Sequence, residues 1–153
     1  ELAKKGYYNE FENNFNKYYR VSSVLYSLNR QAFSIVYLRF ITKDGKVVTP
    51  KSDSILPSIT RRSLVYVAKE YLGLEVEERE VLFDEVKDFA ECGLCGTAAV
   101  ISPVGKIYDH GNEICFPSGM EKMGPVIQKL YDTLTGIQMG HIEAPEGWIK
   151  VIK

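Results

Sequence analysis

Two segments of the chain carry apolar residues at helical spacing, and they constrain the fold more than any other feature. The first segment begins near Thr60 and ends at Gly73, and the second runs from Gly124 to Met139. The apolar positions are Leu64, Val65, Ala68, Tyr71 and Leu72 in the first and Val126, Ile127, Leu130, Leu134 and Ile137 in the second. Each set covers one face of a helix, so each segment predicts an amphipathic helix packed on an apolar surface.

Strand-like segments surround both helices. Residues 21–28 and 33–42 are rich in β-branched and aromatic side chains, which predicts two strands. Asp44-Gly45 then predicts a hairpin, because this dipeptide suits the positive φ angles of a tight turn. Further strands are predicted at residues 46–49, 74–82, 97–104 and 113–116, and a short helix at 83–90. This order of elements predicts an α/β (α+β) fold.

Length and composition bound the class of protein. A chain of 153 residues predicts a single domain spanning 1–153. The 19 basic and 20 acidic residues nearly cancel, which argues against a nucleic-acid partner. The longest mostly apolar run, Phe33 to Ile41, is far shorter than the ~20 residues that span a bilayer, so no membrane partner is expected. Three cysteines, a low and odd number, favour a cytoplasmic protein.

The segment from Leu56 to Arg61 is a candidate anion site. Pro57 shapes a loop that leads into a helix, and Thr60 is the predicted N-cap of that helix. A helix N-terminus presents unpaired backbone N–H groups and the positive end of the helix dipole, which together suit a phosphate. A plain helix cap would use the same residues, and the pattern alone does not separate the two interpretations.

The segment from Cys95 to Ala99 is a second candidate. Its small side chains would let a ligand approach the backbone closely, and Thr97 offers a hydroxyl. The tightly packed start of a strand would have the same composition.

The spacing of Cys92 and Cys95 is that of half a zinc site or a redox pair. A structural zinc site needs four ligands, and Cys115, His110 and His141 do not have the matching spacing. We therefore predict no metal site and interpret Cys92 and Cys95 as buried thiols.

Several blocks in order carry a resemblance to a known family. They are residues 44–50 (DGKVVTP), 54–64 (SILPSITRRSL), 76–79 (VEER), 95–104 (CGTAAVISPV) and 130–138 (LYDTLTGIQ). From Lys43 onward the chain resembles branched-chain amino acid aminotransferases, pyridoxal-phosphate enzymes of the D-amino-acid-aminotransferase-like superfamily. Glu146-Gly147-Trp148 near the end, and Lys4 to Tyr7 near the start, also resemble that family.

The resemblance implies a fold and an activity. The fold would be the C-terminal domain of that superfamily, with mixed sheets forming a pseudo-barrel flanked by helices. The complete enzyme would exchange an amino group between leucine, isoleucine or valine and 2-oxoglutarate, with pyridoxal 5'-phosphate as cofactor. Its partners would be small amino acids and 2-oxo acids, and it would form a homodimer. A D-amino acid aminotransferase or an aminodeoxychorismate lyase of the same superfamily is the alternative, although residues 133–138 favour the branched-chain type.

The resemblance also implies site residues. The amides of Ile59 and Thr60 would hold the cofactor phosphate, and the hydroxyl of Thr97 would join them. The amides of Thr97 and Ala98 would lie beside the substrate carboxylate. Where this chain has Ser58, the family has glycine. The implied cofactor-binding residues are Ser58, Ile59, Thr60, Gly96 and Thr97.

Two departures from the family affect the expected activity. The lysine that forms the Schiff base lies upstream of the block matched by Lys4 to Tyr7, so we predict no catalytic residue in this chain and no activity of the 153 residues alone. Residues 11–38 do not follow the family, and Arg20 lies near the position of a carboxylate that pairs with the pyridine nitrogen. A cation there would disfavour protonation of that nitrogen. The alternative function is a non-catalytic module that binds pyridoxal phosphate or another anion, or that assembles a dimer.

Overall fold

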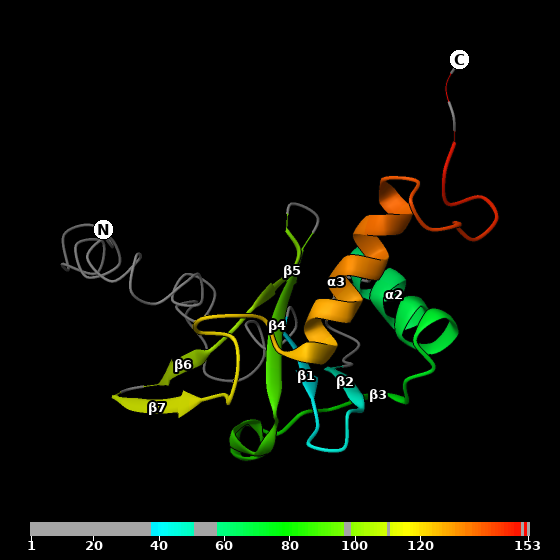
Figure 1. Ribbon diagram of the computed structural model, residues 1–153. Coiled ribbons are helices and arrows are strands. Elements are labelled where there is room, and N and C mark those ends of the chain that lie inside the picture. Colours follow the sequence, from blue (N-terminus) through cyan, green and yellow to red (C-terminus); the bar gives the residue numbers. More distant parts are fainter. Residues whose placement is uncertain (1–37, 51–57, 97–98, 110, 151, 153) are drawn as a thin grey trace, which may run out of the picture.

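The computed structural model describes residues 38–50, 58–96, 99–109, 111–150 and 152, and Figure 1 shows their arrangement. The predicted strand at 21–28 and the first half of the one at 33–42, residues 33–37, lie outside these residues. The elements are β1 (Leu38–Ile41), β2 (Val47–Pro50), α2 (Ile59–Tyr66), the π-helix η3 (Val67–Tyr71), β3 (Val76–Arg79), the 3₁₀-helix η4 (Phe83–Asp88), β4 (Glu91–Gly96), β5 (Val100–Pro103), β6 (Lys106–Asp109), β7 (Asn112–Cys115) and α3 (Pro125–Gln138).

Five of the strands form one mixed sheet in the order β3-β2-β1-β4-β5. The pair β2–β3 is parallel, and the other three pairs are antiparallel. The parallel pair is possible because α2 and η3 form the crossover between its strands. Strands β6 and β7 form a separate antiparallel hairpin. The predicted α/β fold with mixed sheets flanked by helices is confirmed.

The hairpin between β1 and β2 turns where Asp44-Gly45 predicts it. Gly45 has a φ of +87°, and its amide donates to the carbonyl of Thr42 at 3.0 Å. Phe40 pairs with Val48 across the turn. Glycine adopts this positive φ without the steric cost that a side chain would bring, so the local sequence alone fixes this connection.

The first predicted helix exists, but its N-cap is not Thr60. The helix begins at Ile59, and Ser58 is the N-cap, with an extended backbone and a side-chain oxygen that accepts the Arg61 N–H at 3.2 Å. Thr60 is already inside the first turn, so its hydroxyl is not in the capping position. After Tyr66 the helix continues as η3, and Gly73, with a φ of +62°, follows it.

Two strands were missed from the sequence. The segment of β4 was not recognised because Glu91–Gly96 (ECGLCG) contains two glycines and few strongly β-forming residues. It is a strand because it pairs with β1 on one side and β5 on the other. Strand β6 was missed as well, since it is only four residues long and is defined by its pairing with β7. Both strands depend on neighbours that local pattern does not show.

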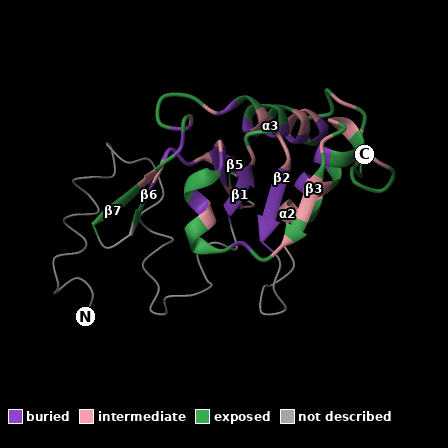
Figure 2. Ribbon diagram, turned by 90° about the horizontal axis from the view of Figure 1, so that it is seen from below, coloured by how far each residue is buried: buried purple, intermediate pink, exposed green. Residues whose placement is uncertain are grey.

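The sheet separates two apolar clusters. The cluster on one face includes Phe40 and Phe89, whose rings stack with centroids 4.7 Å apart. The cluster on the other face lies between the sheet and the two helices, and it includes Leu64 of α2, Ile101 of β5 and Leu130 of α3. Figure 2 shows the buried strands with α3 laid along one side of them. Helices α2 and α3 therefore cover the same face of the sheet. Within the described part of the chain, the helices are too short or too polar to cross a bilayer.

Candidate functional site

One end of the sheet brings together polar residues from neighbouring strands. The pairing registers place Glu78 of β3 opposite Thr49 of β2, and Arg39 of β1 opposite Gly93 of β4. The β1–β2 register places Thr49 beside Arg39. These residues therefore form one row across the sheet. Thr49 is fully buried and Arg39 nearly so, which is unusual for side chains that carry hydrogen-bonding groups or charge.

Helix α2 begins beside this row, and Arg61 holds it there. The Arg61 Nε donates to Thr49 Oγ1 at 3.1 Å, and its Nη2 lies 2.5 Å from Glu78 Oε2. The backbone N–H of Arg61 also donates to the Ser58 side chain. The first turn of α2 is thus attached to two strands and to its own N-cap. Because the first N–H groups of a helix have no partner within it, this turn presents the amides of Ile59 and Thr60 at the end of the sheet.

The C-terminal end of β4 lies at the same end of the sheet as the first turn of α2. Helix α2 contacts β4, and Arg61 lies close enough to Cys95 to affect the pKa of its thiol. Gly96 follows Cys95, and a Cβ built on Gly96 would have nothing within 4 Å, so the space beside it is open. Next to this point Val100 has a φ of +57°, a conformation that strains a β-branched residue. Val100 is therefore strained, and it lies close to this open space.

Burial and neighbouring charges perturb two groups at this end of the sheet. Desolvation lowers the pKa of the Arg39 guanidinium, and the nearby charge of Arg61 acts in the same direction. Burial raises the pKa of the Cys95 thiol to about 11, although Arg39 and Arg61 oppose that rise. Since Glu78 balances the charge of Arg61, the Arg39 guanidinium and the N-terminus of α2 are what make this region favourable for an anion.

The two cysteines of β4 do not act as a pair. Cys92 belongs to the apolar cluster on one face of the sheet, and Cys95 belongs to the cluster on the opposite face. Residues three apart on a strand point to opposite faces, which separates the two thiols. Both are buried, as the sequence predicted, and burial raises the pKa of Cys92 well above its usual value. Among the described residues, no group of three or more metal-ligating side chains is found.

The structure gives a partial view of the predicted site residues. Ser58, Ile59 and Thr60 form the start of α2, and Gly96 ends the strand beside it. Thr97 and Ala98 lie outside the described residues. Ser58 has φ −76° and ψ 129°, an ordinary extended conformation, so the site does not require the glycine that the family carries there. Nothing in the sequence indicated that Arg61 bonds to Thr49 and Glu78, because these hydrogen bonds join residues 12 and 17 positions apart.

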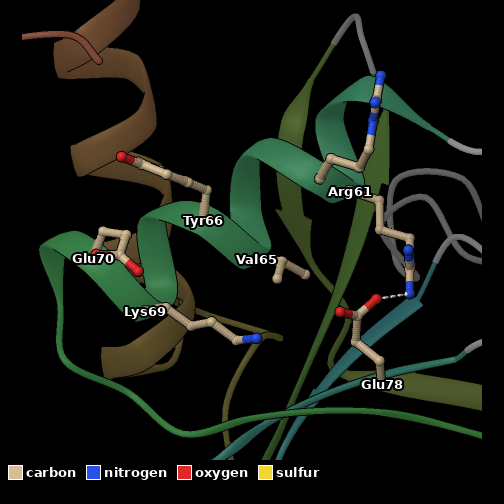
Figure 3. Close-up of a pocket in the computed structure, with 7 residues that line it drawn as sticks. Arg61, Val65, Tyr66, Lys69, Glu70 and Glu78 are labelled. Atoms are coloured by element: carbon tan, nitrogen blue, oxygen red, sulfur yellow. Dashed lines mark hydrogen bonds and ion pairs between the residues drawn. The ribbon is translucent and has the colours of Figure 1, made fainter. Parts of the chain in front are cut away.

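Two shallow grooves lie on the outer side of α2. One has a volume of about 280 Å³, and Arg61, Val65 and Lys69 line it together with Glu78 (Figure 3). The dashed line in that figure marks the contact between Arg61 and Glu78. The other groove, of about 330 Å³, lies between Ile59, Ser63, Tyr66 and Trp148. Gly96 does not line either groove, so they are distinct from the open space at the end of β4.

Comparison with known proteins assigns this architecture to a class. Residues 35–107 match the family model for amino-transferase class IV. This segment, just under half of the chain, belongs to that family. Over 109 residues the chain is 60% identical to the branched-chain-amino-acid aminotransferase of Haemophilus influenzae, a match that covers 71% of this chain and 32% of the relative. It therefore corresponds in part to a branched-chain aminotransferase, and it spans about a third of the length of the relative it matches.

Solved structures agree with this relationship. The branched-chain amino acid aminotransferase of Thermobaculum terrenum, in its PLP-form, is 38% identical, with a TM-score of 0.60 over 70% of this chain and 33% of that one. The Escherichia coli enzyme is 34% identical, with a TM-score of 0.63 over 73% of this chain and 35% of that one. A third such enzyme, from T.th., was solved in complex with 4-methylvaleric acid and is 30% identical, with a TM-score of 0.62 over 74% of this chain and 36% of that one. The fold of the described residues is thus the one found in these enzymes.

Proposed function

We propose that this chain is the C-terminal, cofactor-cradling part of a branched-chain amino acid aminotransferase. The observation that carries the proposal is that the first turn of α2, which is bonded to Thr49 of β2, and the open space beside Gly96 of β4 lie at the same end of the sheet. The amides of Ile59 and Thr60 would hold the phosphate of pyridoxal 5'-phosphate there. The Thermobaculum relative carries PLP, which supports this choice of ligand.

The residues present fit a phosphate group. A Cβ built on Gly96 would meet nothing within 4 Å, so a ligand has room to approach the backbone there. The cation of buried Arg39 adds favourable potential, since the charge of Arg61 is balanced by Glu78. Pyridoxal phosphate supplies an electron sink for the reacting carbon when it is bound. This part of the chain would fix the position of the cofactor, and Thr97 and Ala98 would bind the substrate carboxylate.

The proposed substrates are leucine, isoleucine or valine and 2-oxoglutarate. The T.th. relative binds 4-methylvaleric acid, which has a branched carbon skeleton like that of leucine, and this supports the branched-chain class. We further propose one domain over residues 1–153, a homodimer and a cytoplasmic location. The exposed apolar side chains of Ile59 and Met139 support a covering partner, and the free thiols support a reducing compartment.

A binding experiment tests the proposed phosphate site. Pyridoxal phosphate and pyridoxal, which lacks the phosphate, are titrated into the 153-residue chain labelled with ¹⁵N. We expect tighter binding of the phosphorylated form and shifts of the Ile59 and Thr60 amide signals. Equal affinity for the two ligands, with both amide signals unmoved, would contradict the proposal.

A chimera tests the proposed activity. Residues 35–153 would replace the corresponding C-terminal part of the Haemophilus influenzae enzyme, with residues 1–153 alone as the control. We expect the chimera to transfer the amino group of leucine to 2-oxoglutarate, and the 153 residues alone to show no turnover. A chimera that is folded and loaded with cofactor but inactive towards all three branched-chain amino acids would refute the assignment.

A further inference from the structure

We infer that Arg61 is a positioning residue that fixes the phosphate-binding turn of α2 to the sheet through Thr49 and Glu78. This inference deepens the proposed function and rests on it for the identity of the ligand. The geometry behind it is independent of any ligand, because every contact lies between described residues of the chain.

The side chain of Arg61 joins two strands that lie side by side. Its Nε donates to Thr49 Oγ1 at 3.1 Å and its Nη2 to Glu78 Oε2 at 2.5 Å. Thr49 and Glu78 are paired residues of the parallel strands β2 and β3. The planar guanidinium group can donate in two directions at once from a rigid fork, which a lysine ammonium cannot reproduce with the same geometry.

The backbone of Arg61 completes the attachment. Its N–H donates to the Ser58 side chain at 3.2 Å, and the next N–H, at Arg62, donates to the Ser58 carbonyl at 3.1 Å. These bonds close the first turn, and the amides of Ile59 and Thr60 have no acceptor within the helix. Thr49 is fully buried, and the Arg61 side chain is only 13% exposed. The bond to Thr49 is therefore shielded from water, whereas Glu78 lies at the more exposed end of the anchor, with its side chain 34% exposed.

Fixed amides bind an anion better than mobile ones, because the cost of ordering them has been met during folding. Loss of the anchor should therefore weaken binding of a phosphate without affecting contacts to the rest of the ligand. Arg62 offers a matched control. It is the adjacent arginine on the same helix, it is exposed, and its side chain forms no hydrogen bond with the described residues.

The test compares Arg61→Gln with Arg62→Gln in the 153-residue chain. We expect Arg61→Gln to bind pyridoxal phosphate roughly tenfold or more weakly than the unchanged chain, with the affinity for pyridoxal unaltered. Arg61→Lys should recover part of the loss, and Arg62→Gln should behave like the unchanged chain. Equal losses for both ligands would show a merely structural role and overturn the inference, as would an Arg61→Gln variant with unchanged affinity.

A second measurement needs no ligand, which separates this inference from the proposed function. Hydrogen exchange of the amides at positions 61 and 62 should accelerate roughly tenfold in Arg61→Gln, while the amides of α3 keep their rates. If Arg61→Gln does not fold, Thr49→Val and Glu78→Ala each remove one acceptor of the Arg61 side chain and should show the same local acceleration. Unchanged exchange at 61 and 62 in all these variants would overturn the inference. An unchanged chain that does not prefer pyridoxal phosphate to pyridoxal would instead count against the proposed function.

Discussion

Glu91 is a buried carboxylate that caps a helix 35 residues away, and its removal gives the sharpest test of the packing. The residue is only 5% exposed. Its Oε1 accepts the Val126 N–H at 3.1 Å, and its Oε2 accepts the Ile127 N–H at 2.8 Å. Pro125 has no N–H, and the Gln128 N–H bonds to the Gly124 carbonyl. Every N–H donor at the start of α3 is therefore used, two of them by one side chain.

The perturbation is Glu91→Ala. Each hydrogen bond to a charged group is worth about 1.5–3 kcal/mol. The substitution also removes the cost of burying a carboxylate, so the net loss in the free energy of unfolding should be about 2–4 kcal/mol. For a chain of this size, that loss corresponds to a fall in melting temperature of roughly 5–15 °C. The negative charge of Glu91 near the positive end of the α3 dipole also stabilises the fold, so its loss adds to the loss of the hydrogen bonds.

The assay is urea unfolding followed by circular dichroism and by the fluorescence of Trp148, the only tryptophan. Glu121→Ala is the control, since this exposed carboxylate lies close to the start of α3 and forms no hydrogen bond with the described residues. It should change the stability by less than about 0.5 kcal/mol. A Glu91→Ala variant as stable as Glu121→Ala would refute the reasoning.

A double-mutant cycle with Gly124 tests the same contact from the other side. A Cβ placed on Gly124 would overlap the carboxyl group of Glu91. Gly124→Ala should therefore destabilise the unchanged chain, and it should cost much less in the Glu91→Ala background, where the space is vacant. The coupling between the two changes should exceed about 0.5 kcal/mol. Additive effects would show that the two groups do not compete for space.

Three further predictions concern packing, thiol reactivity and pH. Gly93→Ala places a Cβ 2.7 Å from the Ile101 side chain, so the free energy of unfolding should fall by about 1–3 kcal/mol. An unchanged denaturant midpoint would contradict this. At pH 8 a thiol reagent should label exposed Cys115 in the native chain and the two buried thiols of β4 only on unfolding, as mass spectrometry would show. The hydrogen bond from Arg79 holds the pKa of Glu85 below its usual value. Glu85 therefore contributes its full stabilisation above the pKa of about 4.3 that it has in the unfolded chain. This contribution to the free energy of unfolding is lost as the pH falls through the lower pKa of the folded chain. Between pH 6 and pH 2 the free energy of unfolding should fall less for Glu85→Gln than for the unchanged chain. The difference between the two falls should be under about 1 kcal/mol.

Much of the fold could be predicted because it depends on short stretches of sequence. The apolar stripe of α3 identifies a helix, and Asp44-Gly45 identifies a hairpin, since both depend on residues within a few positions of each other. The candidate site was predicted by the same means, and it stays a prediction. A loop that enters a helix and a small-residue step were visible in the sequence, and the described parts of both lie at one end of the sheet.

The attachment of that site could not be predicted. Arg61 lies within the recognised segment, but nothing in the local pattern connects it to Thr49 and Glu78. The N-cap was assigned to Thr60 and not to Ser58, because both residue types cap helices and only the backbone path selects one. The strained Val100 gave no signal in the sequence.

The sequence by itself determined the helices, the hairpin turn and the family, since these follow from periodicity, turn chemistry and ordered motifs. Tertiary structure alone decided that Glu91–Gly96 is a central strand, that Glu91 caps α3, and that two cysteines three residues apart face opposite clusters. The physical reason is that each of these depends on pairing partners or polar contacts distant along the chain. Such contacts form only when the sheet and the helices have closed around a common core.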